Sequence, residues 1–339
     1  MLNFKKKLVF YFSIVAIILL LINVVWDLFK KKNYNPDARE LSKIELENIF
    51  WKTLDAYGIK ANWVTKKKFH QADEDSISYQ FIVTIPQDLP IPLIIKDINN
   101  IIRKDISASV SEEKKFFGDT ELRIYSNEYL KLKALFIPDK NIVRDNKEIS
   151  FLILDAMNLS DDDYKMFLFS KYPLCAVIVP DPENIPKADS LSKYSKEYSL
   201  LLNNDIDDSK MKLSQEFGKE ILKKSIRTIL ESFPKRNLIF VDENSTLFNS
   251  PIYNYVRDVF KSNGKIIYHI SECIKLDQTD EEEMFSKLKF YIEDTTTNKK
   301  LFYTSFENFR KMIPMIEQYK KKGGKIIPVS RCYLTLKGL

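Results

Sequence analysis

The sequence predicts an α/β protein whose carboxyl-terminal half is a short, TIM-like barrel of seven strands. Two observations support this prediction. From Ser150 onward, β-branched apolar runs recur between segments typical of helices or loops: SFLILD, LCAVIVP, SLLLNND, NLIFVDE, KIIYHI, KLFYTS and KIIPVS. Continuous apolar runs also indicate strands buried on both faces, as parallel strands are. About seven βα units close most naturally into a barrel, although an open doubly wound sheet has the same rhythm.

Residues 1–36 form the first expected region, with a cytoplasmic tip, a membrane anchor and a joint. Leu8–Trp26 reads LVFYFSIVAIILLLINVVW, which is long enough as a helix to cross a hydrocarbon core of roughly 30 Å. Asp27 and Lys30 follow it in place of the small residues of a cleavage site, so we expect a retained transmembrane helix, a signal-anchor. Lysines flank the segment equally on both sides, so charge leaves its orientation open.

Residues 37–145 form the second region, a small α+β module. A helix capped by Asp37 and stopped by Gly58 leads it. The remaining expected elements are strands at 77–85, 120–126 and 131–138 and a helix at 93–103. His70 stands alone in this region, with no group of histidine, cysteine or carboxylate residues that chemistry would need. We therefore expect packing or binding from it, and its role stays open.

Composition narrows the classes of partner. The chain has 339 residues with 53 basic and 47 acidic side chains, and the lysines occur in short scattered runs. Nucleic-acid binding is not expected from such a pattern, because it lacks one basic stripe with interleaved aromatic residues. The three cysteines, Cys175, Cys273 and Cys332, lie far apart without a CxxC spacing, so neither a disulfide framework nor a zinc knuckle is predicted.

Residues 146–339 form the third region, the barrel, where functional groups are expected at the carboxyl ends of strands. Turn formation alone accounts for about half of the polar residues there, because Asn, Asp and Pro also begin turns. Asp161, Asp162 and Asp163 follow Ser160 and are assigned to helix capping. The remaining strand-end candidates are Asp155, Pro180, Asp181, Asn203, Asn204, Asp205, Asp242, Glu243 and Ser305.

Three segments of this region resemble the divergent polysaccharide deacetylase family. They are FLILDAMN, LIFVDENS and the closing GGKIIPVSRCYL, preceded by IPMIEQYKKKGGK as the family's final helix and turn. The resemblance covers about residues 150–334 and rests on order and spacing. It implies an irregular seven-stranded barrel, an envelope location and metal-dependent removal of acetyl groups from carbohydrate.

The metal site implied by the resemblance is incomplete in this chain. Asp155 falls on the first residue of the family's Asp-Asp pair, but the second, a metal ligand, falls on Ala156. Glu216 in QEFG stands where a histidine is expected, and Thr304, Ser305 and Phe306 replace a Gly-His-Pro element, whereas Asp242 is retained. His70 and His269 are the chain's two histidines, and neither lies at these positions. We therefore interpret Asp155 as a relic and not as a catalytic base.

The sequence thus favours a membrane-anchored, deacetylase-like pseudoenzyme that binds envelope glycan or an envelope protein, with no resident cofactor. Its large domain is expected outside the cytoplasmic membrane. Groove candidates are Asn203, Asn204, Asp205 and Ser305. The alternative is an active carbohydrate deacetylase that holds a divalent metal with Asp155, Asp242 and Glu216, an all-carboxylate set suited to magnesium or calcium.

Overall fold

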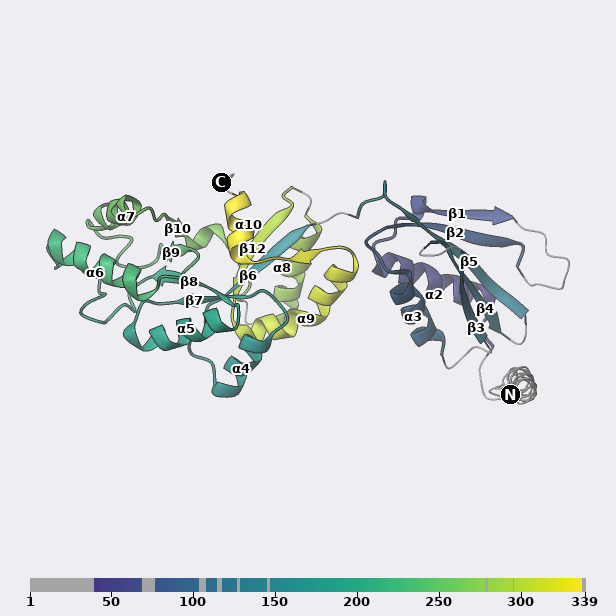
Figure 1. Ribbon diagram of the computed structural model, residues 1–339, viewed down its shortest axis with the longest axis horizontal. Helices are drawn as coiled ribbons and strands as arrows, with labels where there is room; N and C mark the ends of the chain where they lie inside the picture. Colours follow the sequence, from purple (N-terminus) through teal and green to yellow (C-terminus); the bar gives the residue numbers. More distant parts are fainter. Residues whose placement is uncertain are drawn as a thin grey trace, which may run out of the picture. The chain divides into compact units, whose positions relative to one another are not determined.

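The computed structural model describes residues 40–68, 77–103, 108–114, 118–126, 129–144, 147–277, 280–294 and 296–336. The expected membrane segment, Asp37 and His70 lie outside these ranges. Within them, no helix is long and apolar enough to cross a membrane. The chain divides into two compact units, residues 1–142 and 143–339, where the sequence suggested a boundary at 145/146 (Figure 1).

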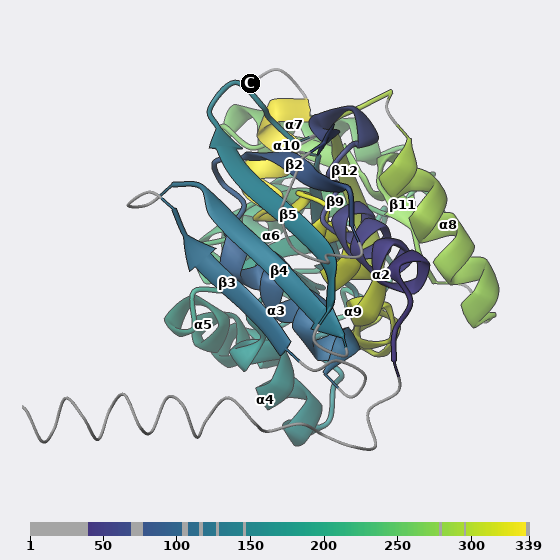
Figure 2. The same ribbon diagram turned by 90° about the vertical axis from the view of Figure 1, so that its right-hand side faces the viewer.

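The amino-terminal unit is a five-stranded mixed sheet with two helices on one face (Figure 2). The strand order is β1-β2-β5-β4-β3, in which β2 and β5 are parallel and the other neighbours are antiparallel. The sequence patterns missed the two edge strands, β1 and β3, which carry few apolar residues. The elements are α2 (Lys43–Ala56), η1 (Ala61–Trp63), β1 (Val64–Lys68), β2 (Tyr79–Pro86), α3 (Ile91–Ile102), β3 (Ala108–Glu113), β4 (Thr120–Ser126) and β5 (Tyr129–Asp139).

Local sequence explains where the two helices begin and which face they bury. Ser42 caps α2 in a capping box with Glu45, so the helix begins a turn later than a cap at Asp37 would place it. Phe50 of α2 packs on Phe81 of β2, with ring centroids 5.0 Å apart. In α3, five isoleucines at helical spacing are buried against the sheet: Ile91, Ile94, Ile95, Ile98 and Ile102.

The carboxyl-terminal unit contains a curled parallel sheet whose order follows the chain around a ring. The order is β10-β9-β8-β7-β6-β12-β11, and all described pairs are parallel. An open doubly wound sheet would reverse direction at a switch point, which this order does not do. The strands are β6 (Glu148–Ile153), β7 (Cys175–Ile178), β8 (Glu197–Leu202), β9 (Ile239–Val241), β10 (Ile267–His269), β11 (Ile274–Lys275) and β12 (Lys299–Thr304).

The ring differs from the expected barrel at two places. Its seventh strand is β11, a two-residue strand in a segment without an apolar run, and not KIIPVS. KIIPVS forms β13 (Lys325–Ile326), which pairs only with the start of β6, at Glu148 and Ile149. In addition, β10 and β11 are the two edges of the sheet, joined through the short 3-10 turn η3 (Ile270–Glu272), so the hydrogen-bonded ladder is open there.

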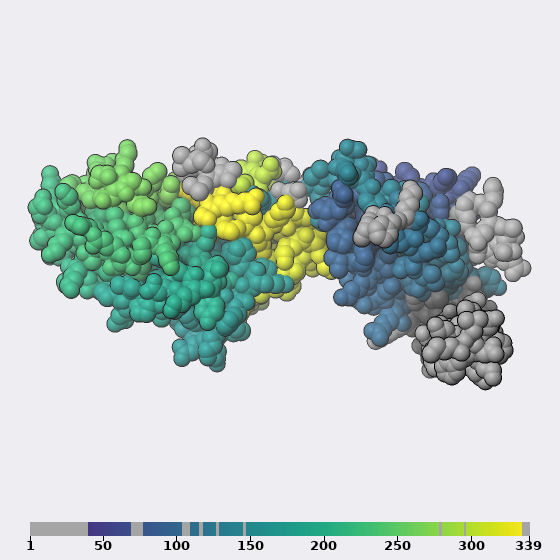
Figure 3. Space-filling model, in the orientation of Figure 1, coloured from purple at the N-terminus to yellow at the C-terminus, as the bar shows by residue number. Residues whose placement is uncertain are grey.

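Two apolar clusters lie on the two sides of this ring. The outer cluster packs the strands against helices α4 (Asp161–Phe169), α5 (Ile185–Lys193), α6 (Lys219–Ser232), α7 (Tyr253–Ser262), α8 (Glu281–Glu293) and α9 (Phe306–Lys321). Ser160 caps α4 by accepting the Asp163 amide at 3.2 Å, which confirms the capping role predicted for this segment. The residues after 300, coloured towards yellow, form part of the surface of this unit (Figure 3).

The inner cluster is filled from the carboxyl-terminal helix, α10 (Val329–Leu336). Tyr333 lies 4.5 Å from Tyr268 and 6.0 Å from Phe240, measured between ring centroids, and its hydroxyl donates to Glu272. The cysteines are free thiols buried in this cluster: Cys175, Cys273 and Cys332. The interior of the ring is therefore a packed core, so any ligand must bind at its ends or in its loops.

Candidate binding site at the carboxyl ends of the strands

Strand alternation decides which end residues face the interior of the ring. Leu152 of β6 and Leu154, which follows this strand, pack in the inner cluster together with Tyr303 of β12. Asp155 follows Leu154 and therefore turns toward the surrounding helices. On β9 the inner residue is Phe240, and Asp242 continues on the same side. The strand-end candidates are thus divided between two sides of the sheet.

Asp155 binds the start of a helix. Its Oδ1 accepts the backbone amide of Phe306, the first residue of α9, at 2.8 Å. Ser305 is the N-cap of the same helix, and its side chain accepts the amide of Asn308 at 3.2 Å. A carboxylate at a helix N-terminus is stabilised by the helix dipole and satisfies an otherwise unpaired donor. Ala156, beside it, is fully buried and supplies no ligand atom.

Asp242 forms a local turn at the end of β9. Its Oδ1 accepts the amide of Asn244 at 2.9 Å, and its backbone carbonyl accepts the hydroxyl of Ser245 at 2.5 Å. The first of these contacts is that of an Asx turn, which aspartate forms without any ligand. The arrangement orders the loop between β9 and α7, which also contains Glu243 and Thr246.

Asn203 and Asn204 organise the loop after β8. Asn203 bonds to Asp205 twice, accepting its amide at 3.1 Å and donating to its carboxylate at 2.7 Å. The Oδ1 of Asn204 accepts both the amide and the hydroxyl of Thr246, each at 2.7 Å. The second pair ties the β8–α6 loop to the β9–α7 loop, so the two loops form one surface.

That surface contains a pocket of about 250 Å³, here called the loop pocket. Its buried apolar residues are Ile206, Leu213 and Leu247. The polar lining residues are Asn203, Asn204, Lys212, Ser214, Gln215, Glu216, Thr246 and Ser250. The structure therefore brings together Asn203, Asn204 and Glu216, whereas Asp155, Asp205, Asp242 and Ser305 do not line this pocket.

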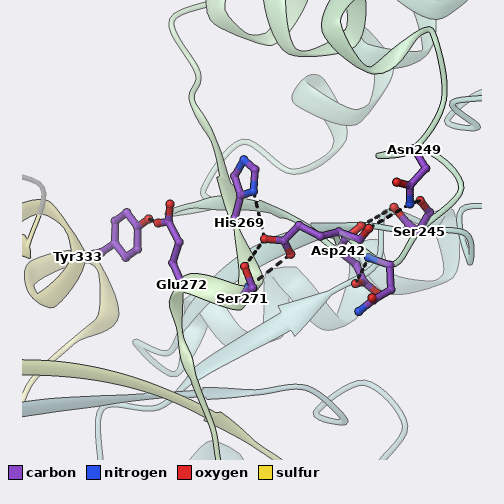
Figure 4. Close-up of polar contacts among 9 residues, drawn as sticks. Asp242, Ser245, Asn249, His269, Ser271, Glu272 and Tyr333 are labelled. Carbon is purple, nitrogen blue, oxygen red and sulfur yellow. Dashed lines mark hydrogen bonds and ion pairs between the residues drawn. The ribbon is translucent and has the colours of Figure 1, made fainter.

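A second polar cluster is centred on Glu243, which bonds to His269 and Ser271; both of these partners are labelled in Figure 4. The Glu243 carboxylate bonds to Nδ1 of His269 at 3.0 Å and accepts the hydroxyl of Ser271. Burial opposes ionisation of Glu243, but the bonds from Ser271 and the adjacent His269 outweigh it, so the pKa of Glu243 lies below its ordinary value. Figure 4 shows the other ring nitrogen of His269 pointing away from the carboxylate.

The Glu243 cluster shows what sequence reasoning missed. The sequence indicates Glu243 only as an acid at a strand end, and it places His269 at none of the positions where the resembled family has a histidine. Their pairing could have been inferred from the adjacent strands β9 and β10, which place Val241 opposite His269. The pKa of Tyr303 is raised first by burial, then by Cys273, and then by the nearby acids Asp242, Asp277 and Glu243.

The described side chains do not fit a divalent-metal site. Asp155 caps α9, Asp242 forms a turn and Glu216 lines the loop pocket, so each carboxylate has its own surroundings. In the part of the chain that the structure describes, no three His, Cys, Asp or Glu residues are grouped so as to hold a metal ion. The expectation that the chain has no resident cofactor stays a prediction.

Comparison with known proteins gives weak structural similarities. No protein-family model and no curated protein matches the chain. Similar solved structures include a mutant CE4 family pseudoenzyme with restored enzymatic activity (12% identity, TM-score 0.37, covering 70% of this chain and 97% of that one). They also include the wild-type pseudoenzyme from Bacillus anthracis (12%, 0.36, covering 63% and 74%) and a peptidoglycan N-acetylglucosamine deacetylase (10%, 0.35, covering 56% and 89%). Similarity at this level does not assign the chain to a family.

Proposed function

We propose that the chain is a membrane-anchored, deacetylase-like protein of the cell envelope that binds glycan and does not deacetylate it. The observation that carries this proposal is the loop pocket, which combines an apolar base with polar side chains from two loops. Sugars offer both hydroxyl groups and apolar ring faces, so such a lining suits them. The motif resemblance in FLILDAMN and LIFVDENS favours glycan over other polar ligands.

The state of the catalytic groups supports binding without hydrolysis. A general base must reach the proton that it removes, within about 2.6–3.2 Å or through one water molecule. One oxygen of Asp155 is already bonded to the Phe306 amide, and Ala156 replaces a metal ligand in the resembled motif. The chain would then retain the fold and lose the reaction.

Calorimetric titration of the full-length chain with N-acetylglucosamine oligomers and their deacetylated counterparts tests the binding proposal. We expect saturable binding by the parent and at least a tenfold loss in Gln215→Trp, because the indole would fill the pocket. Lys223→Trp is the matched control, since Lys223 is exposed on α6 and outside the pocket. Absence of binding to every oligomer would refute the proposal.

The proposed location is tested separately. We propose that the barrel lies outside the cytoplasmic membrane, because the resembled family works in the envelope. Protease added to intact cells with permeabilised outer layers should then digest the large domain. Resistance of that domain to the protease, with digestion after lysis as the control, would argue for the cytoplasmic side.

A further inference from the structure

The segment that supplies most of the loop pocket has a charge opposite to that of the whole chain. The chain carries a formal charge of +6. The segment 203–218, which supplies most of the pocket, has two basic residues, Lys210 and Lys212, and four acidic ones: Asp205, Asp207, Asp208 and Glu216. The segment 203–218 therefore has a formal net charge of −2, from two basic and four acidic residues. A ligand attracted to this surface is expected to be cationic, since complementary charge steers binding.

The contacts inside the pocket identify which charge is free to meet a ligand. Two charged residues line it, Lys212 and Glu216. The Lys212 ammonium forms an ion pair with Asp207 at 3.2 Å. The Glu216 carboxylate has no ion-pair or hydrogen-bond partner among the described residues, where only its backbone amide is bonded, to Ser214 at 3.3 Å. The lining thus offers one unneutralised carboxylate.

The neighbouring amides offer both donors and acceptors for hydroxyl groups. Asn204 uses its Oδ1 on Thr246, which leaves its Nδ2 group as a donor. The Gln215 side-chain amide makes no hydrogen bond within the described part of the chain. A pocket of about 250 Å³ is small for a ligand site, where roughly 300–1,000 Å³ is usual, so it suits a single ring.

We infer that the loop pocket binds a hexosamine whose amino group is free and positively charged, with Glu216 as the partner of the ammonium group. This inference rests on the proposed function, because glycan binding supplies the sugar and the Glu216 charge specifies the amine. The preferred glycan is then the deacetylated form, which is what a deacetylase produces. An N-acetylated sugar cannot form this ion pair, since its amide nitrogen is neutral.

The test compares short glucosamine oligomers with N-acetylglucosamine oligomers of the same length, titrated into the full-length chain near pH 6, where the amine is protonated. We expect the parent to bind the deacetylated oligomer about tenfold more tightly, the ratio that one charge-assisted hydrogen bond commonly gives. Glu216→Gln should bind both oligomers alike. Glu220→Gln should keep the preference, because Glu220 is exposed on α6 and does not line the pocket.

The outcomes separate this inference from the function on which it rests. Equal or tighter binding of the acetylated oligomer by the parent, or an undiminished preference in Glu216→Gln, overturns the inference and leaves glycan binding intact. No binding of either oligomer refutes the proposed function and the inference with it. Free lysine is a further probe: if it binds as tightly as the glucosamine oligomer, the pocket recognises an amine and not an amino sugar.

Discussion

At Asp155, the carboxylate oxygen Oδ1 lies 2.8 Å from the amide nitrogen of Phe306, at the positive end of the α9 dipole. The two residues are 151 positions apart. Sequence alone identifies a carboxylate at a strand end, but it cannot identify a partner that only the folded ring brings near. The sequence thus identifies Asp155 as a candidate, whereas its role depends on the tertiary contact with Phe306.

Replacing Asp155 tests this role through stability. Asp155→Ala removes the acceptor for the Phe306 amide and should lower the free energy of unfolding by about 1 kcal/mol, the usual loss for a helix cap. Asp155→Asn keeps an acceptor oxygen and should cost less. Urea unfolding measures both, and glycan binding should be unchanged in each variant. A loss of binding in Asp155→Asn without loss of stability would place Asp155 in the binding site instead.

The Glu243 cluster gives a pH-dependent prediction. The pKa of the Glu243 carboxyl is lower in the folded chain than in the unfolded chain, so ionised Glu243 contributes stability above its ordinary pKa of about 4.5. This contribution is lost as the pH falls through the folded pKa. Glu243→Gln should therefore be less stable than the parent at pH 6, with a smaller difference at pH 3. Urea midpoints at the two pH values measure it, and a difference that grows toward pH 3 would contradict the assignment.

At the scale of elements, the apolar runs were sufficient to place six strands of the ring, because each run is buried on both faces. The seventh strand, β11, has two residues and pairs with β12 through Ile274 and Lys275, so it has no sequence pattern of its own. KIIPVS has the pattern of a core strand because it continues into α10, whose Val329 and Cys332 enter the interior. A run of apolar residues indicates burial, and in this segment the buried residues Val329 and Cys332 belong to a helix.

The Gly-Gly turn before β13 gives an element-scale prediction with an internal control. A Cβ on Gly324 would lie 2.2 Å from the ring of Tyr319, which is held by a hydrogen bond from its hydroxyl to the Lys147 carbonyl at 2.6 Å. Gly324→Ala should therefore cost about 1–3 kcal/mol of stability. Gly218→Ala meets nothing within 4 Å; the entropy gained by removing a glycine and the poorer N-cap of α6 oppose each other, so stability should change by less than about 1 kcal/mol. Equal effects in thermal melts would show that the turn relaxes without cost.

At the scale of the whole molecule, the sequence predicted two folded regions after the apolar segment, and the structure divides the chain at residue 142. Each unit has its own apolar cluster. The binding candidates were predictable as residue types at strand ends. Their grouping was not predictable, because the loop pocket depends on a contact between two loops. This contact joins Asn204 and Thr246, which are 42 residues apart in the chain.

Separate cores predict that the anchor is dispensable for folding. Removal of Met1–Lys32 should yield a soluble, folded protein, because the apolar side chains of Leu8–Trp26 would be buried in lipid and not in the later domains. Circular dichroism and a cooperative thermal transition of the truncated chain would measure this. Insoluble or unfolded material from the truncation would show that the segment is part of a core.

Release of acetate from acetylated oligosaccharides tests the central claim, binding without deacetylation, most directly. The full-length chain would be assayed without metal and with added zinc, manganese or magnesium, beside the Asp155→Asn variant. We predict no release above background in any condition, because Asp155 is engaged at α9 and Ala156 supplies no ligand. Metal-dependent release by the parent that disappears in Asp155→Asn, a change that removes a base worth typically 10²-fold to 10⁴-fold in rate, would contradict the claim and establish an active deacetylase.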